Sequence, residues 1–408
     1  MNTKIIRYRF RRLCALIIGI VFLLSGIVKL LDPVGAGLVV EEYFRFFHLG
    51  FLQPAAKAVG VAMALFEALL GAALISGIWR KTVAIVSTVL ICFFTLLTLV
   101  LAIFNPDMEC GCFGEVIHLT NLQSFLKNLV LLLLASFAFV PFRDFGENRK
   151  RKFVSFTIVA LSLVAFGLYS LKNIPLVDYT AFTPGSVLMS ARNSGETGSD
   201  DFMSTFIYEK NGQEGAFTLD KLPDSTWTFV RTETIKVNRN ERKDNTPILS
   251  FTDSTGTYRD ELAANGNVMA ISVYEPEKVK GEVWTRISEV VKGADEAGFK
   301  PLLLMAGNGK TLGNLGSIVP DVLDILEPVS FFSDRKTLVS LNRSNGGATW
   351  FNDGELIQKF PAGNLPSDEQ ILKMTGYDPT ESMLRSSSKG QIRFQGFLLY
   401  ALAILLLL

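Results

Sequence analysis

Two cysteines separated by one glycine, Cys110-Gly111-Cys112, are the residues of this chain best suited to do chemistry. Glycine tolerates backbone angles that other residues avoid, so the chain can turn tightly enough for the two sulfurs to meet. A disulfide that closes such a small ring is expected to be strained and easily reduced. The spacing therefore indicates a redox pair, and the alternatives are a structural clip or two free thiols.

The other reactive side chains near this pair are few. His118 lies six residues after Cys112 and could stabilise a thiolate; the alternative is an ordinary polar loop residue. Thiolates also suit copper(I) or zinc, but these three side chains leave a metal ion without a fourth ligand, so we predict no metal site. The remaining cysteines, Cys14 and Cys92, fall within apolar runs and are interpreted as small apolar residues.

The composition argues against a single soluble globule. Hydrophobic residues make up 49% of the 408 residues, charged residues make up 19%, and the mean hydropathy is +0.32. A helix needs roughly 20 apolar residues to span the hydrocarbon core of a bilayer. Runs of about this length predict six membrane spans, near residues 13–31, 57–78, 82–104, 122–142, 153–171 and 392–408.

Basic residues in the short loops predict the orientation of these spans. The basic N-terminus 1–12, the loop around Arg80 and the basic loop 143–152 should lie in the cytoplasm. The loop 105–121 and the segment 172–391 then lie outside, on the oxidising side where disulfides persist. We therefore expect a multi-pass protein of the inner (cytoplasmic) membrane with a large domain in the periplasm.

Two charged residues stand out within the apolar runs. Glu67 lies near the middle of the second run, where an ionisable group is costly unless it is paired or faces the bundle interior. Lys29, near the outer end of the first run, is a candidate partner. Glu67 could contact a proton or a ligand, or it could be a buried hydrogen-bonding strut. Between these runs, residues 37–48 read as an interfacial helix or as a segment packed on the bundle.

Several of these features together resemble the DoxX/MauE family. The resemblance rests on Ser25-Gly26-Ile27-Val28-Lys29-Leu30-Leu31-Asp32-Pro33-Val34-Gly35, on Glu67 and on Cys-Gly-Cys-Phe-Gly, and it covers residues 10 to 142. It implies a four-helix membrane bundle associated with redox chemistry. MauE-type members are implicated in forming or supporting disulfides in exported proteins.

The segment that follows the fifth span is polar and has strand and helix patterns. A hairpin with an Asn211-Gly212 turn is predicted in its first half. Strands are then predicted at 268–274, 301–305, 330–332, 348–351 and 355–360, with helices at 281–298, 318–326, 336–341 and after Pro366. This order resembles a thioredoxin-like fold.

Two departures from thioredoxin bear on function. Glu275-Pro276-Glu277-Lys278 stands where the cysteine pair would be, and Gly347 replaces the cis-proline. Because residues 113–408 contain no cysteine, we interpret this part as a redox-inert binding module. The corner formed by Asn345, Gly346 and Gly347 is its candidate partner-binding site.

The predicted fold is a membrane α-helical bundle, with a DoxX-like four-helix core plus additional spans, and an α/β thioredoxin-like extracytoplasmic domain preceded by a β-rich segment. The predicted parts are a basic N-terminus 1–12, a bundle 13–142 with outer loop 105–121, a basic loop 143–152, a fifth helix 153–171, a β-rich segment 172–262, a thioredoxin-like domain 263–390 and a C-terminal helix 392–408.

Two functions from different classes follow. In the first, Cys110 and Cys112 exchange disulfides with exported or envelope proteins. In the second, the chain is a membrane scaffold or a subunit of an envelope or secretion complex, without activity of its own. No cofactor is expected. A quinone is a possible but doubtful alternative, since a quinone-linked oxidase normally needs a second cysteine pair, which this chain lacks. The sequence has no phosphate-binding glycine loop, Ser-His-Asp arrangement or nucleic-acid signature.

Overall fold

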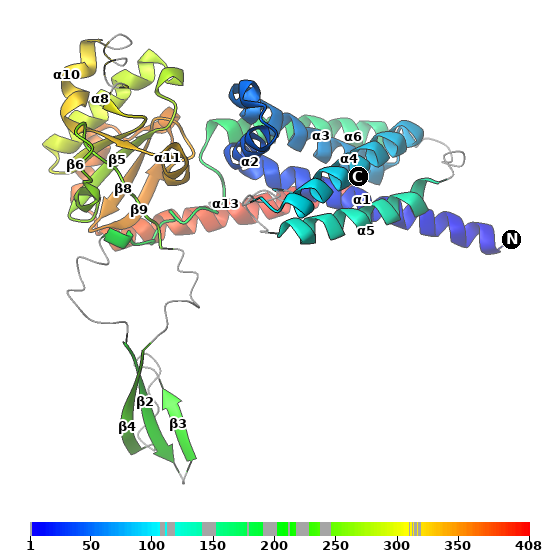
Figure 1. The fold of residues 1–408 in the computed structure, drawn as a ribbon, viewed down its shortest axis with the longest axis horizontal. Helices are drawn as coiled ribbons and strands as arrows, with labels where there is room; N and C mark the ends of the chain where they lie inside the picture. Colours follow the sequence, from blue (N-terminus) through cyan, green and yellow to red (C-terminus); the bar gives the residue numbers. More distant parts are fainter. Residues whose placement is uncertain are drawn as a thin grey trace.

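The computed structural model describes residues 2–106, 111, 119–140, 152–177, 179–190, 202–210, 213–217, 228–236, 246–309, 311, 313, 316 and 320–408. A group of long helices and an α/β domain lie end to end along the long axis of the molecule (Figure 1). Cys110, Cys112 and His118 lie outside the described residues.

Long apolar helices form the first part. They are α1 (Asn2–Leu31), α3 (Ala56–Ser76), α4 (Arg80–Phe104), α5 (Asn121–Phe139), α6 (Phe153–Lys172) and α13 (Pro379–Leu407). Within the described ranges these six helices have the length and the hydropathy to cross a membrane. The chain is therefore a multi-pass membrane protein, as its apolar runs predict. Helix α13 begins before its apolar stretch because Asp378 caps it and proline occupies its first position.

Small residues let the first two long helices approach closely. A Cβ atom on Gly26 of α1 would lie 2.5 Å from both the Ala64 carbonyl oxygen and the Ala68 nitrogen of α3. A Cβ atom on Gly71 of α3 would likewise collide with the backbone of Leu23. Such small-residue contacts are typical of membrane helices, where close packing must stabilise association without a hydrophobic driving force.

A shorter helix, α2 (Pro33–Phe46), and a 3₁₀ turn, Gly50–Ala55, connect α1 to α3. Asp32 caps α2 by accepting a hydrogen bond from the Gly35 N–H at 2.9 Å. Val34 and Leu38 pack against a hydrophobic core of the α/β domain. The segment expected to lie at the membrane interface or against the bundle is therefore a packing element between the two parts of the molecule.

The α/β domain contains a mixed sheet with the strand order β7-β6-β5-β8-β9. Its strands are β5 (Asn267–Val273), β6 (Lys300–Ala306), β7 (Ser330–Ser333), β8 (Gly347–Asn352) and β9 (Glu355–Phe360). The neighbours β5, β6 and β7 are parallel, whereas β8 is antiparallel to both β5 and β9. Asp353 and Gly354 form the β8–β9 turn with φ values of 46° and 75°, as a two-residue hairpin requires.

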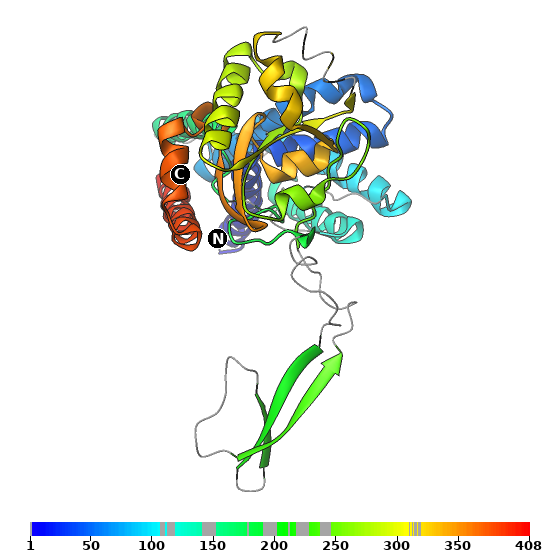
Figure 2. The same cartoon turned by 90° about the vertical axis from the view of Figure 1, so that its left-hand side faces the viewer.

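Helices cover both faces of this sheet (Figure 2). One core contains buried residues of α8 (Gly281–Glu296) and α12 (Asp368–Thr375), and the other contains buried residues of α11 (Arg335–Leu341). The alternation of β5 places Met269 and Ile271 in the first core and Val268 and Ala270 in the second. The predicted α/β architecture is confirmed. The helix expected at 318–326 is shorter in the described residues, where a 3₁₀ turn (Pro320–Val322) leads into α10 (Leu323–Leu326).

A separate three-stranded antiparallel sheet is formed by β2 (Phe202–Lys210), β3 (Gln213–Phe217) and β4 (Thr228–Lys236), in the order β3-β2-β4. Lys210 lies opposite Gln213, so the strands on either side of Asn211-Gly212 pair as a hairpin. The two turn residues themselves lie outside the described residues.

Candidate functional site

A cavity of about 380 Å³ lies among the helices α1 to α5. Most of its wall is apolar and aromatic, with side chains from all five helices. The α2 residues on the wall are Ala36, Val39, Val40, Tyr43 and Phe44. The polar side chains on the wall belong to Ser25, Lys29, Tyr43, Glu67, Thr98, Lys127 and Asn128.

A buried ion pair forms part of this wall. The Lys29 ammonium lies 2.7 Å from Glu67 Oε1 and 2.8 Å from Oε2, and the Ser25 hydroxyl donates to Oε2 at 2.7 Å. Ser25 and Lys29 are four residues apart on α1, so they share one helix face opposite α3. Glu67 is 2% exposed. The structure thus brings together the two charged residues that stood out in the apolar runs.

A second polar contact joins α4 and α5 on the same cavity. The Asn128 side-chain amide donates to Thr98 Oγ1 at 3.1 Å and to the Phe94 carbonyl at 3.2 Å. The Phe94 ring also lies under the Lys29 ammonium, 6.0 Å from nitrogen to ring centroid. Asn128 is a site residue that the sequence analysis did not identify. It could have been found in the same way as Glu67, because a polar side chain within an apolar run needs a partner.

The glycine of the Cys-Gly-Cys motif lines this cavity as well. Gly111 has a φ of +61°, a conformation that favours glycine, and a Cβ atom there would collide with the Val39 side chain of α2. The cysteines on either side and His118 lie outside the described residues. The structure therefore places the centre of the motif on the cavity wall, next to α2.

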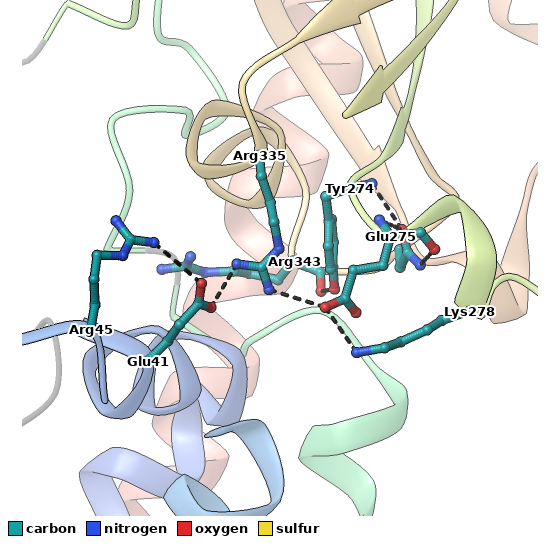
Figure 3. A network of polar contacts seen from close by, with 8 residues as sticks. Glu41, Arg45, Tyr274, Glu275, Lys278, Arg335 and Arg343 are labelled. Carbon is teal, nitrogen blue, oxygen red and sulfur yellow. Dashed lines mark hydrogen bonds and ion pairs between the residues drawn. The ribbon is translucent and has the colours of Figure 1, made fainter. Parts of the chain in front are cut away.

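A network of ion pairs joins α2 to the α/β domain (Figure 3). Arg335 of α11 is its centre, with Nη1 2.7 Å from Glu41 Oε2 and Nη2 3.1 Å from Glu275 Oε1. Lys278 also contacts Glu275, at 3.1 Å, and Lys336 contacts Glu42 at 3.3 Å. Burial opposes the charge on Arg335, but the hydrogen bonds with the two carboxylates outweigh it and raise the pKa of the guanidinium.

Among the described ion pairs that join the two parts, the most deeply buried is that of Asp32 and Arg343, 2.9 Å from Oδ2 to Nη2. The two side chains are 8% and 2% exposed. The Tyr274 hydroxyl donates to the Arg343 carbonyl oxygen at 2.9 Å. Burial raises the pKa of this phenol, so Tyr274 stays protonated and can donate at any physiological pH.

The corner Asn345-Gly346-Gly347 lies against the end of β5. Asn345 Oδ1 accepts hydrogen bonds from the backbone N–H groups of Tyr274 and Glu275, at 2.9 and 3.1 Å, and its amide donates to the Glu275 carbonyl at 2.8 Å. Gly346 and Gly347 are buried. These residues hold the corner to the segment that carries Glu275. Their expected role in binding a partner stays a prediction.

Within the described ranges, no three histidine, cysteine, aspartate or glutamate side chains gather as a metal site would require. The three residues of the soft-metal alternative, Cys110, Cys112 and His118, are outside those ranges. On the described cavity wall, Lys29 and Glu67 form an ion pair, and the Ser25 hydroxyl donates to the same carboxylate.

Comparison with known proteins identifies the part of the chain that forms the cavity. Residues 7–141 match the family model of methylamine utilisation protein MauE, and residues 202–239 match a domain of unknown function, DUF8463. No curated protein and no solved structure matches the chain. The MauE match spans α1 to α5 and the Cys-Gly-Cys motif, so the MauE part of the predicted resemblance is confirmed.

Proposed function

We propose that this protein supports thiol–disulfide chemistry of exported or envelope proteins through Cys110 and Cys112. The observation that carries the proposal is the position of Gly111, which is on the wall of a cavity that also holds the pair of Lys29 and Glu67. The basic loops support an orientation in the inner membrane with this motif on the periplasmic side, where disulfides persist.

The exchange needs only the cysteine pair and a partner protein. A thiolate of one loop cysteine attacks a disulfide of the partner, forming a mixed disulfide and releasing a partner thiolate. The second loop cysteine then attacks the mixed disulfide, so the loop becomes oxidised and the partner leaves as a dithiol. In the reverse direction the same steps oxidise the partner. Two electrons and two protons pass between the two proteins, and neither direction requires a quinone.

The α/β domain enters this proposal as a thioredoxin-like module that binds partners without redox chemistry. The strand order β9-β8-β5-β6, with β8 antiparallel to its neighbours, supports the likeness. So does the corner at Asn345, which lies against Glu275, at the end of the strand that would precede a cysteine pair. The domain contains no cysteine, so exchange must occur at the membrane loop.

Single substitutions of the loop cysteines test the exchange. Cys112→Ser should accumulate a mixed disulfide with a partner, visible as a DTT-sensitive band of higher mass in membranes trapped with acid. Cys110→Ser should do the same if Cys112 is the attacked sulfur. Cys92→Ser is the matched control, because Cys92 is an exposed cysteine on α4. This variant keeps both loop cysteines and should show no such band. A Cys110→Ser/Cys112→Ser protein that maintains normal growth and normal envelope disulfides would contradict the proposal.

A second candidate function is a scaffold without activity. It is favoured by the docking of the α/β domain on α2, because Glu275, at the corner where a thioredoxin would react, is held by Arg335 in an internal ion-pair network. A scaffold predicts normal function when both loop cysteines are serine, and it predicts co-purification of envelope proteins with that variant. The cysteine substitutions therefore distinguish the two functions directly.

A further inference from the structure

The cavity among α1 to α5 has the dimensions of a ligand site. Its volume of about 380 Å³ falls in the range of small-molecule pockets, roughly 300 to 1,000 Å³. Its wall consists mainly of Val, Leu, Phe and Met side chains, so an apolar body would fit there better than water. The polar groups occupy a small part of the wall, as is usual where a few groups fix the orientation of a ligand.

The ion pair on the wall indicates that the head group placed at Lys29 is neutral. Lys29 and Glu67 neutralise each other at 2.7 Å. A charged head group at this pair would therefore lose its hydration without gaining a counter-ion from it. An ammonium has three N–H donors, and two of those of Lys29 reach the two oxygens of Glu67. The third can meet an acceptor on a ligand.

We propose that this cavity binds a neutral, lipid-soluble molecule with an apolar body and a hydrogen-bond-accepting head group directed at Lys29. A carbonyl oxygen is the simplest such head. This chemistry is shared by an uncharged lipid with ester groups and by a lipid-soluble ring compound with ring carbonyls. The site does not depend on disulfide exchange, although its occupant would lie close to Gly111.

Thermal unfolding of the purified full chain in detergent tests the site with three probes. Dioctanoylglycerol represents the lipid source and decylubiquinone represents the ring source, while octanoate tests a charged head group. We expect at least one neutral probe to raise the Tm by several degrees and octanoate to leave it unchanged. A shift with dioctanoylglycerol alone assigns the lipid source, and a shift with decylubiquinone alone assigns the ring source.

Substitutions locate the binding. Met63→Trp should fill the cavity, because Met63 lines it, and should weaken binding of the neutral probe at least tenfold. Ile103→Trp is the matched control, since Ile103 is 69% exposed on α4, and it should keep the full shift. Lys29→Met should also reduce the shift. The proposal is overturned if neither neutral probe raises the Tm, or if Met63→Trp and Ile103→Trp respond alike.

A second inference rests on a different observation, the two faces of α2. Ala36, Val39, Val40, Tyr43 and Phe44 form its cavity face. At helical spacing on the other side, Val34, Leu38, Glu41 and Glu42 contact the α/β domain. Helix α2 is therefore a wall shared by the cavity and the docked domain.

We infer that the α/β domain acts as a clamp on α2 and so controls access to the cavity. The pair of Asp32 and Arg343 fixes the start of the helix, and Arg335 fixes its middle through Glu41. Release of the domain would leave the outer face of α2 without its partner residues, so the cavity wall would loosen. Because coupling between two sites is reciprocal, occupation of the cavity should also favour the docked domain.

Thiol labelling of one cavity residue tests the clamp. In a chain whose four cysteines are replaced by serine, Met63→Cys reports access through its rate of reaction with a small charged methanethiosulfonate. We expect Arg343→Ala and Arg335→Ala each to raise this rate several-fold. Arg385→Ala is the matched control, because Arg385 pairs with Glu381 on the exposed part of α13, and it should leave the rate unchanged.

The Arg335→Ala variant keeps this test decisive if Arg343→Ala fails to fold, because the Arg335 pairs are partly exposed. Limited proteolysis of the same membranes reports whether the domain has been released. A released domain with an unchanged labelling rate at position 63 would overturn the clamp. So would an equal rise in rate in the Arg385→Ala control.

Discussion

Two buried ion pairs begin three residues apart at the end of α1, and they serve different parts of the molecule. Lys29 reaches Glu67 within the helical bundle, on the wall of the cavity. Asp32 reaches Arg343 of the α/β domain and also caps α2. Burial of a charge alone therefore does not separate a ligand site from a structural contact. The surroundings of each pair make that distinction.

The partners of each pair show the difference in detail. Asp32 uses one carboxylate oxygen for the Gly35 N–H and the other for Arg343, so both oxygens hold protein groups in place. In the other pair the carboxylate accepts hydrogen bonds from Lys29 and Ser25, and the Lys29 ammonium, which lines the cavity, keeps a third N–H donor. The first pair is suited to fix a helix, and the second is suited to meet a ligand.

The largest loss of stability is expected when the ion pair of Asp32 and Arg343 is broken. Arg343→Ala leaves the Asp32 carboxylate buried without its ionic partner, which should destabilise the protein by about 3–5 kcal/mol. Thermal unfolding of the purified chain in detergent measures this change. Arg385→Ala, which breaks a pair whose side chains are 68% and 59% exposed, should cost no more than about 1 kcal/mol. Equal losses of stability in Arg343→Ala and Arg385→Ala would contradict the difference expected between a buried and an exposed ion pair.

The cavity pair should behave differently because it can be replaced as a unit. Lys29→Met alone leaves a buried carboxylate and should cost about 3 kcal/mol or more. The double variant Lys29→Met/Glu67→Leu should recover most of that stability while losing the shift in Tm caused by the neutral probe. The unfolding midpoint with and without decylubiquinone or dioctanoylglycerol measures both effects. If the double variant kept the probe shift, the pair would have no role in binding.

This contrast also shows what the sequence could and could not predict. Charges are costly within apolar runs, so Lys29 and Glu67 were recognisable before their contact was known. Apolar runs and strand patterns likewise predicted the long helices and the order of the α/β domain. Asp32 and Arg343 carried no such signal, because Asp32 follows the end of an apolar run, Arg343 lies in a polar stretch, and the two are far apart in the sequence. Only the packing of α2 between the two parts brings them together.

A smaller loss of stability is expected for Arg335, which lies at the partly exposed edge of the contact between α2 and the α/β domain. The Arg335 side chain is 37% exposed, so solvent screens its pairs with Glu41 and Glu275. Arg335→Ala should therefore cost only about 1 kcal/mol in thermal unfolding, well below the loss in Arg343→Ala. The labelling rate at position 63 should nevertheless rise, since α2 loses its central contact. A loss of stability as large as that in Arg343→Ala would mean that the two arginines do not differ as their exposure predicts.

The smallest effect concerns a carboxylate on the surface of the α/β domain, which provides the contrast to both buried pairs. The Thr255 hydroxyl donates a hydrogen bond to the Asp253 carboxylate. The backbone N–H groups of Thr257 and Thr255 and the Arg259 side chain donate to the same carboxylate. Together these hydrogen bonds lower the pKa of the Asp253 carboxyl from 3.8 to about 2. A folded-state pKa below the unfolded value gives stability that is present above about pH 4 and is lost as the pH falls through about 2.

Asp253→Asn should therefore lower the Tm slightly at pH 5, and the difference from the unsubstituted chain should vanish as the pH approaches 2. Thermal unfolding at a series of pH values measures this change, and Asp321→Asn, on the surface of the same domain, is the control. A Tm difference that persisted unchanged at pH 2 would show that the hydrogen bonds of Asp253 do not depend on its charge.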